Sequence, residues 1–205
     1  MLSGLWGKKI GITQVFHNDK VIPVTVIDVG NWVITDIKTV DRDGYNAIQV
    51  GAVRKRYAGE KATIQWVRNP KEYFTVLREI RVDVLPENIK IGKEVDFYDQ
   101  LEPGKTVDVF GITIGRGFAG VIKRHSFRGP PASHGSTMGR RPGSIGHMRA
   151  RGRVIKGKRM PGHLGVQKCV MKNLEIVEVK KDGPVVLVKG SVPGYAGSLV
   201  FIRKQ

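Results

Sequence analysis

Cysteine is almost absent from this sequence, and long apolar runs are missing from it. Cys169 is the single cysteine among 205 residues, which excludes a disulfide framework and a zinc site built on several cysteines. No apolar run approaches the ~18 residues of a membrane-spanning helix. The first eleven residues contain lysines but no apolar stretch of the kind found in secretory signals. We therefore expect a protein of a reducing compartment that makes no membrane contact.

Acidic residues are missing from one long segment. Residues 111–168 carry thirteen basic side chains and no acid, whereas the other 147 residues carry 22 basic and 18 acidic groups. Most of the formal net charge of +17 therefore lies in 58 consecutive residues. A solvated surface usually mixes both signs, so a segment without internal counter-ions indicates a polyanionic partner. The thirteen basic residues are Arg116, Lys123, Arg124, Arg128, Arg140, Arg141, Arg149, Arg151, Arg153, Lys156, Lys158, Arg159 and Lys168.

The same segment has too few bulky side chains to build a core of its own. It contains 13 of the 26 glycines, and Phe118 and Phe127 are its only aromatic residues. A long excursion of this kind is either disordered or functional. We interpret it as an extension that becomes ordered on binding, in which arginine and lysine grip phosphate oxygens and glycine lets the backbone approach closely. Few aromatics argue against base stacking on single strands, so a folded RNA recognised by shape is the favoured partner.

The flanking sequence predicts strands. Short β-branched runs separated by turn signals occupy residues 21–29, 32–40, 47–53, 77–84, 106–110, 174–179, 185–189 and 198–203. Such a pattern is typical of a mainly β protein with a small closed β-barrel. We expect the body at residues 1–110 and 169–205, with a small insertion near 54–76, and the basic extension at 111–168. The strongest helical pattern is the short run Gly117–Arg124.

Two motifs suggest chemistry that the rest of the sequence does not support. Gly115–Gly120 matches G-x-G-x-x-G, but the acidic residue that a dinucleotide site needs about 20 positions later is absent. Four histidines (His125, His134, His147 and His163) lie in the basic segment at spacings too long for a paired metal site. We expect no enzyme, no cofactor, no metal and no small-molecule substrate.

Ordered motifs along nearly the whole chain resemble the bacterial type of ribosomal large-subunit protein three (L-three). In chain order they are Gly4–Gly11, Ile22–Val26, Thr113–Arg124, Ser133–Ser136, Arg141–Gly146, Gly152–Val154, Lys156–Met160, Gly162–Gly165, Asn173–Leu174 and Leu187–Gly190 with its continuation to Gly194. The resemblance is weakest at residues 54–76.

The resemblance implies a barrel of the translation-protein type on the surface of the large ribosomal subunit, with the extension threading into rRNA. It implies that the extension reaches towards the peptidyl-transferase centre, that the protein supports early subunit assembly, and that its other partners are neighbouring large-subunit proteins. A bacterial, cytoplasmic ribosome is expected rather than an organellar one. The expected rRNA-binding side chains are Arg116, Lys123, Arg124, Arg128, His134, Arg140, Arg141, Arg149, Arg151, Arg153, Lys156, Lys158, Arg159 and His163. Close backbone approach is expected at Gly115, Gly117, Gly135, Gly143, Gly146, Gly152 and Gly157.

The sequence departs from the family pattern in three places. Ile114 replaces a residue that is usually basic, and Ala150-Arg151-Gly152 stands where Thr-Pro-Gly usually precedes the Arg-Val pair. Arg149 stands where some bacterial members carry a methylated glutamine. Arginine has no side-chain amide, so that modification is expected to be absent here. One alternative function stays open, which is a free RNA chaperone or regulator that uses the same basic arm.

Overall fold

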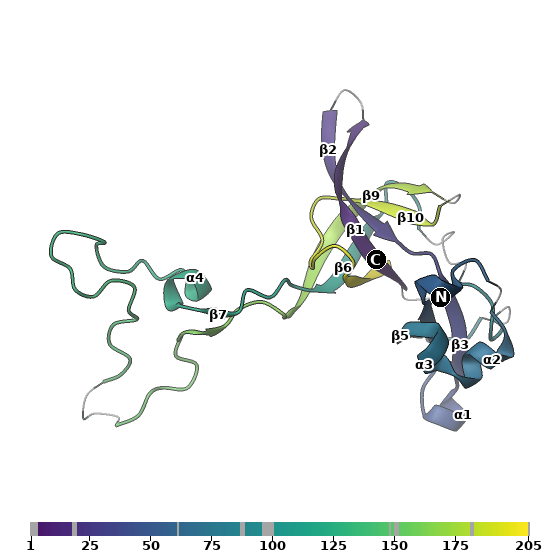
Figure 1. The fold of residues 1–205 in the computed structure, drawn as a ribbon, viewed down its shortest axis with the longest axis horizontal. Coiled ribbons are helices and arrows are strands. Elements are labelled where there is room, and N and C mark those ends of the chain that lie inside the picture. The colour runs from purple at the N-terminus through teal and green to yellow at the C-terminus, as the bar shows by residue number, and fades with distance from the viewer. Residues whose placement is uncertain are drawn as a thin grey trace. The chain divides into compact units, whose positions relative to one another are not determined.

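The computed structural model describes residues 4–17, 20–60, 62–86, 89–95, 101–147, 149, 152–180 and 183–204. The chain divides into two compact units, one formed by residues 1–112 and 168–205 and the other by residues 113–167. Figure 1 shows both units as a ribbon. We call the first unit the body and the second the extension, and we describe each by itself.

Six antiparallel strands of the body form a closed barrel in the order β1-β11-β6-β9-β10-β2. Every neighbouring pair is antiparallel. The mainly β prediction is therefore confirmed. The strands are β1 (Gly4–His17), β2 (Lys20–Asp28), β6 (Thr106–Ile112), β9 (Lys168–Lys180), β10 (Val185–Lys189) and β11 (Leu199–Lys204).

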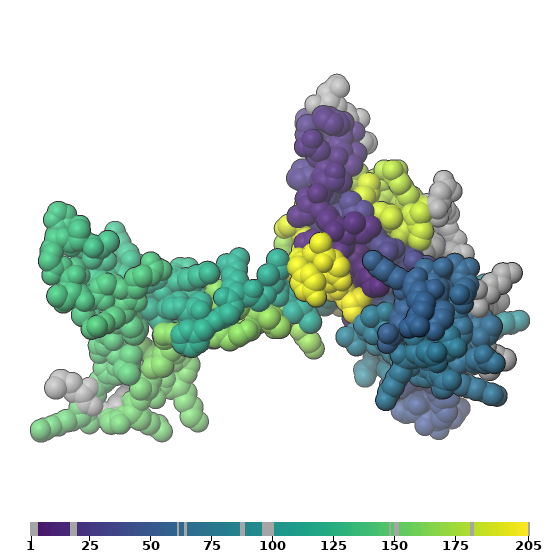
Figure 2. Space-filling view, viewed as in Figure 1, coloured from purple at the N-terminus to yellow at the C-terminus, as the bar shows by residue number. Residues whose placement is uncertain are grey.

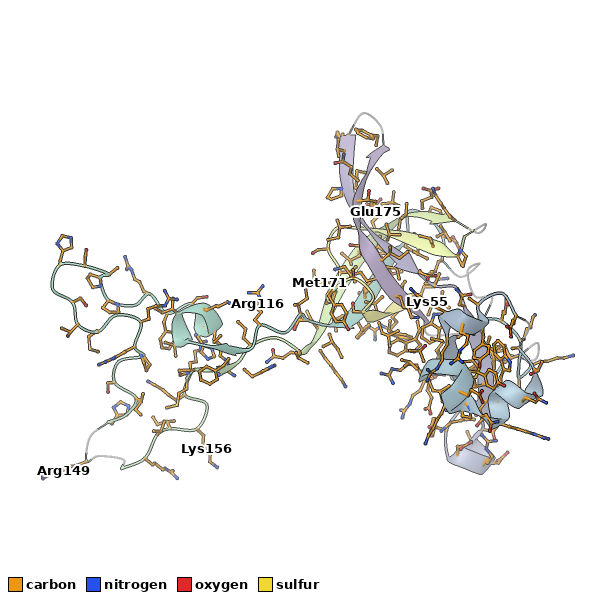
Figure 3. The ribbon with its side chains drawn as sticks, in the orientation of Figure 1. Lys55, Arg116, Arg149, Lys156, Met171 and Glu175 are labelled. Atoms are coloured by element: carbon orange, nitrogen blue, oxygen red, sulfur yellow. The ribbon has the colours of Figure 1, made fainter. Side chains whose placement is uncertain are left out.

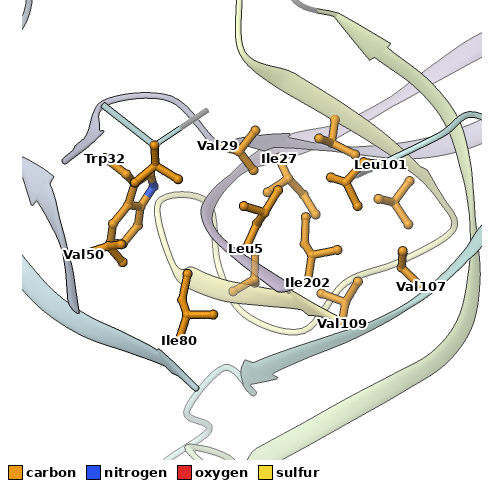
Figure 4. Close-up of a cluster of buried hydrophobic side chains, with 14 of the residues drawn as sticks. Leu5, Ile27, Val29, Trp32, Val50, Ile80, Leu101, Val107, Val109 and Ile202 are labelled. Atoms are coloured by element: carbon orange, nitrogen blue, oxygen red, sulfur yellow. The ribbon is translucent and has the colours of Figure 1, made fainter. Parts of the chain in front are cut away.

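The core follows from the alternation of side chains along these strands. In β11, Val200 and Ile202 are fully buried, whereas the residue that follows, Arg203, is exposed. Because successive residues of a strand point to opposite faces, one face of β11 lines the core. Figure 4 shows Ile202 beside Leu5 and Val109, which come from β1 and β6.

A second, three-stranded antiparallel sheet lies outside the barrel order. It pairs β3 (Trp32–Lys38), β4 (Ala47–Val53) and β5 (Phe74–Arg81), with β4 in the centre. The sequence predicted strands in these three regions but not the separate sheet, because alternation marks a buried face but does not identify the strand it pairs with. Short helices fill the connections, namely α1 (Val40–Asp43), the 3-10 turn η1 (Lys55–Tyr57), α2 (Ile64–Arg68) and α3 (Pro70–Tyr73).

The sequence missed one further strand and misjudged one helix. Strand β1 was not predicted, because its glycines and lysines do not resemble a β-branched run. The predicted helix Gly117–Arg124 is instead a two-residue strand, β7 (Phe118–Ala119), followed by helix α4 (Val121–His125). Phe118 is 80% exposed, so the apolar spacing that suggested a longer helix does not mark a buried helical face. Within the described residues, no helix is long and apolar enough to cross a membrane.

Candidate RNA-binding surface

The extension begins as a narrow antiparallel stem formed by its own two ends. Thr113 donates its backbone N–H to the carbonyl of Gln167 at 3.0 Å, and Arg116 donates to Leu164 at 2.8 Å. Leu164 in turn donates to Gly117 at 2.9 Å. Further along, β7 pairs with β8 (Gly162–His163). In sequence the stem continues strands β6 and β9, so the two ends of the basic segment lie on paired backbone rather than on a loose linker.

Gly165 is required at a close backbone contact within this stem. Its φ is +86°, and a Cβ built there would overlap the carbonyl oxygen of Ile114 and lie 2.9 Å from the Cα of Gly115. Only glycine combines this left-handed conformation with so close a backbone contact. The sequence prediction had no role for Gly165, whose one signal was its place in the Gly162–Gly165 motif.

Arg124 belongs to the internal structure of the extension. Its Nη1 donates to the carbonyl of Met160 at 2.7 Å, and His125 Nε2 lies 3.1 Å from the same oxygen. A Cβ on Gly162 would lie 2.7 Å from the Arg124 guanidinium, so that glycine leaves room for it. Arg124 therefore ties α4 to the returning strand, and one of its nitrogens is already occupied before any RNA arrives.

The other predicted RNA-binding side chains that the structure describes are exposed. They are Arg116, Lys123, Arg128, His134, Arg140, Arg141, Arg149, Arg153, Lys156, Lys158, Arg159 and His163; Arg151 lies outside the described residues. Figure 3 shows the side chains of Arg116, Arg149 and Lys156 projecting from the backbone. Within the described part of the chain, none of these side chains forms an ion pair, and residues 113–167 contain no acid to offer one. Their donors are free for oxygens of another molecule.

The seven glycines predicted to allow close approach divide into groups. Five have positive φ: Gly117, Gly135, Gly143, Gly152 and Gly157. Their backbone conformation alone accounts for glycine there. Gly115 faces Val166 within the stem, at 2.9 Å for a Cβ built there. At Gly146 a built Cβ would meet no atom within 4 Å, and the φ angle is not positive. Close approach to a partner is therefore the remaining explanation for glycine at that position, and it stays a prediction.

Nothing in the described residues gathers three or more His, Cys, Asp or Glu side chains into a metal site. His134 has a φ of +59° and is exposed, and His125 is occupied by Met160. The extension therefore presents cations and hydrogen-bond donors, which suit contact with phosphate oxygens.

A buried carboxylate holds together the strands from which the extension starts. Asp108 of β6 accepts hydrogen bonds from Arg203 Nη2 of β11 at 2.8 Å and from the Asn173 N–H of β9 at 3.2 Å. The bond from Arg203, more than the one from Asn173, holds the pKa of Asp108 below its ordinary value of 3.8. The Asn173 N–H is available because this residue has a φ of +56°, within an irregular stretch of the β6–β9 register.

Replacing Asp108 by Asn is expected to lower the melting temperature by roughly 4–10 °C at pH 7, because the amide loses the charge-assisted bond and buries a polar group. A lowered folded-state pKa gives stability that is present above pH ~4 and is lost as the pH falls through the folded-state value. The difference between Asp108→Asn and wild type should therefore shrink in thermal melts below pH ~4. Glu102→Gln, which removes an exposed pair with Lys105, is the matched control and should leave the melt unchanged; equal effects of the two changes would contradict the role of Asp108.

Comparison with known proteins places this sequence in one family. Residues 80–184 match the family model "Ribosomal protein L3". The chain is 44% identical to a protein of Pelotomaculum thermopropionicum over 207 residues, which cover 100% of this chain and 97% of that protein. It is 44% identical to a protein of Nitrosomonas europaea (99% and 96% covered) and 42% identical to one of Solibacter usitatus (100% and 99% covered). All three are named large ribosomal subunit protein uL3.

Proposed function

This chain belongs to the ribosomal protein L3 family, and on that basis we propose that it is a structural component of the large ribosomal subunit whose extension binds large-subunit rRNA directly. The family is non-enzymatic, so the prediction that the chain is no enzyme is confirmed by membership. Its closeness to bacterial relatives supports a place in the ribosomes of the bacterial cytoplasm.

The observation that supports direct RNA binding is the exposure of so many cations in a unit without a single acid. Residues 113–167 offer guanidinium and ammonium groups with no internal counter-ion, and the phosphates of folded RNA supply the missing charge. The stem and the Arg124–Met160 bond order the base of the extension, so fewer residues must be ordered during binding.

The finer parts of the proposal follow from the family resemblance. The extension reaches towards the peptidyl-transferase centre, where it contributes structure while RNA performs the chemistry. The body, a barrel of the translation-protein type, sits on the subunit surface and contacts neighbouring proteins. The protein joins the subunit early in assembly. At position 114 the exposed Ile114 removes one phosphate contact, and Arg149 and Arg151 add two cations later in the extension.

Sedimentation of a native lysate through a high-salt sucrose gradient tests this function against a free RNA chaperone. We expect stoichiometric comigration with the large subunit, measured by mass spectrometry of the fractions, because a protein threaded through folded rRNA is not released by screening alone. Recovery of the chain at the top of the gradient, together with RNA binding at low salt, would favour the chaperone and overturn the structural role.

A further inference from the structure

The net charge of the body is concentrated in one short insertion. Residues 54–73, which connect β4 to β5, carry six basic and two acidic residues, whereas the rest of the body carries 17 basic and 16 acidic residues. The body is therefore close to neutral except for this insertion. Local charge excess on a neutral surface marks a site for a polyanion more specifically than the total charge does.

The insertion is held by aromatic packing and by hydrogen bonds from the Arg54 side chain to backbone carbonyls. Trp66 and Phe74 are buried in a small core, and the Trp66 ring stacks on Tyr73 with centroids 5.2 Å apart and planes 8° from parallel. Arg54 donates to the carbonyls of Lys71 at 2.8 Å and Phe74 at 3.3 Å. These contacts fix the shape of the insertion without using its other described cations.

Four of those cations face solvent without a partner of opposite charge. Lys55, Arg56, Arg68 and Lys71 are exposed, and no ion pair involves them within the described residues. Elsewhere on the body several exposed or half-exposed lysines are paired, as in the Lys38–Glu79 bridge at 3.0 Å and the Lys189–Glu175 bridge at 2.7 Å. Long side chains project from the blue part of the surface in Figure 2, and Lys55 is labelled in Figure 3.

The surface chemistry favours RNA over a protein partner. The large apolar side chains that the structure describes as exposed include none from residues 54–73, because the aromatic residues of the insertion pack inward. A stable protein interface needs an apolar centre, whereas contact with phosphates needs only accessible cations. The cation of Arg56, 5.3 Å from the Tyr57 ring centroid, is held in place and still exposed.

We propose that Lys55, Arg56, Arg68 and Lys71 form a second RNA-binding surface on the body, which contacts the phosphate backbone of large-subunit rRNA separately from the extension. The proposal rests on the proposed function for the identity of the RNA. It adds an attachment point on the body, at the region where the chain resembles the family least.

The test is filter binding of the full-length protein to an in-vitro transcript of the bacterial large-subunit rRNA across 0.05–0.5 M salt. The variant carries Lys55→Gln, Arg56→Gln, Arg68→Gln and Lys71→Gln, and the matched control carries Lys20→Gln, Lys90→Gln, Lys93→Gln and Lys172→Gln, four exposed lysines of the neutral body. If two to four phosphate contacts are lost, the slope of log K against log salt falls by about two to four. Affinity at 0.15 M salt then falls about 30-fold or more relative to the control.

Equal slopes and affinities for the variant and the control would overturn the second surface. A charge-preserving variant, with Lys55→Arg, Lys71→Arg, Arg56→Lys and Arg68→Lys, should bind like wild type, which separates lost contacts from misfolding. Neutralising the extension in parallel distinguishes the two proposals. If the extension variant weakens binding and the insertion variant matches its control, only the second surface fails; if neither weakens binding, direct RNA binding itself fails.

Discussion

Replacing Arg140, Arg141, Arg153 and Arg159 of the extension by glutamine is expected to weaken binding to large-subunit rRNA by on the order of 10²–10³ at 0.15 M salt. Each exposed arginine that leaves a phosphate lowers the number of released counter-ions by about one, so the salt slope should fall by about four. The four side chains are exposed and lie in a segment without acids. Filter binding across a salt series measures both quantities.

Arg124→Gln is the informative comparison within the same unit. Because Arg124 donates to Met160, its loss should loosen the contact between α4 and the returning strand, and hydrogen exchange should rise there. Its effect on the salt slope should be smaller than that of an exposed arginine. An extension variant with an unchanged slope would show that these arginines do not meet phosphates, and direct binding by the extension would have to be abandoned.

Replacing Gly165 by Ala is expected to open the stem and to destabilise it by about 2–5 kcal/mol, combining the left-handed backbone with overpacking. The added methyl group would overlap the Ile114 carbonyl, so the hydrogen bonds of Arg116, Leu164 and Val166 across the stem should be lost. Amide exchange at Leu164 should accelerate by on the order of 100-fold or more.

Gly157→Ala provides the control for conformation alone. Gly157 also has a positive φ, +80°, but no neighbouring atom within 4 Å of a built Cβ. The Gly157→Ala substitution should lower the stability of the extension by only about 1–2 kcal/mol, the penalty of the left-handed backbone. Amide exchange at the stem should not change. If both variants leave the exchange of Leu164 unchanged, the close contact at Gly165 does not hold the stem.

Composition and local pattern predicted the features that depend on neighbours in sequence. The segregation of charge is a property of the chain itself. The strand Val185–Lys189 is found at its predicted bounds because three valines of high β propensity lie between turn signals. Pairing partners depend on contacts that local pattern does not encode. Local pattern therefore predicted neither the separate sheet of β3, β4 and β5 nor the strand β1.

Parts of the candidate site were beyond sequence reasoning for the same reason. Arg124 looks like any other cation of the extension, and only the Met160 carbonyl, 36 positions away, shows its structural task. The predicted glycines looked alike too, yet a positive φ explains five of them and contact with the Val166 side chain explains Gly115. Which exposed arginines meet phosphates stays a prediction, because a basic composition names no individual contact.

The pairing of β1 with β11, in which Gly4 lies opposite Arg203, has a consequence during synthesis. The barrel cannot close until β11 has left the ribosomal tunnel, although β1 emerged first. The whole cationic extension is translated before β9, β10 and β11, so it is exposed while the body that anchors it is still an open sheet. A nascent chain in this state offers its strongest RNA-binding segment to any nearby RNA before it is a folded protein.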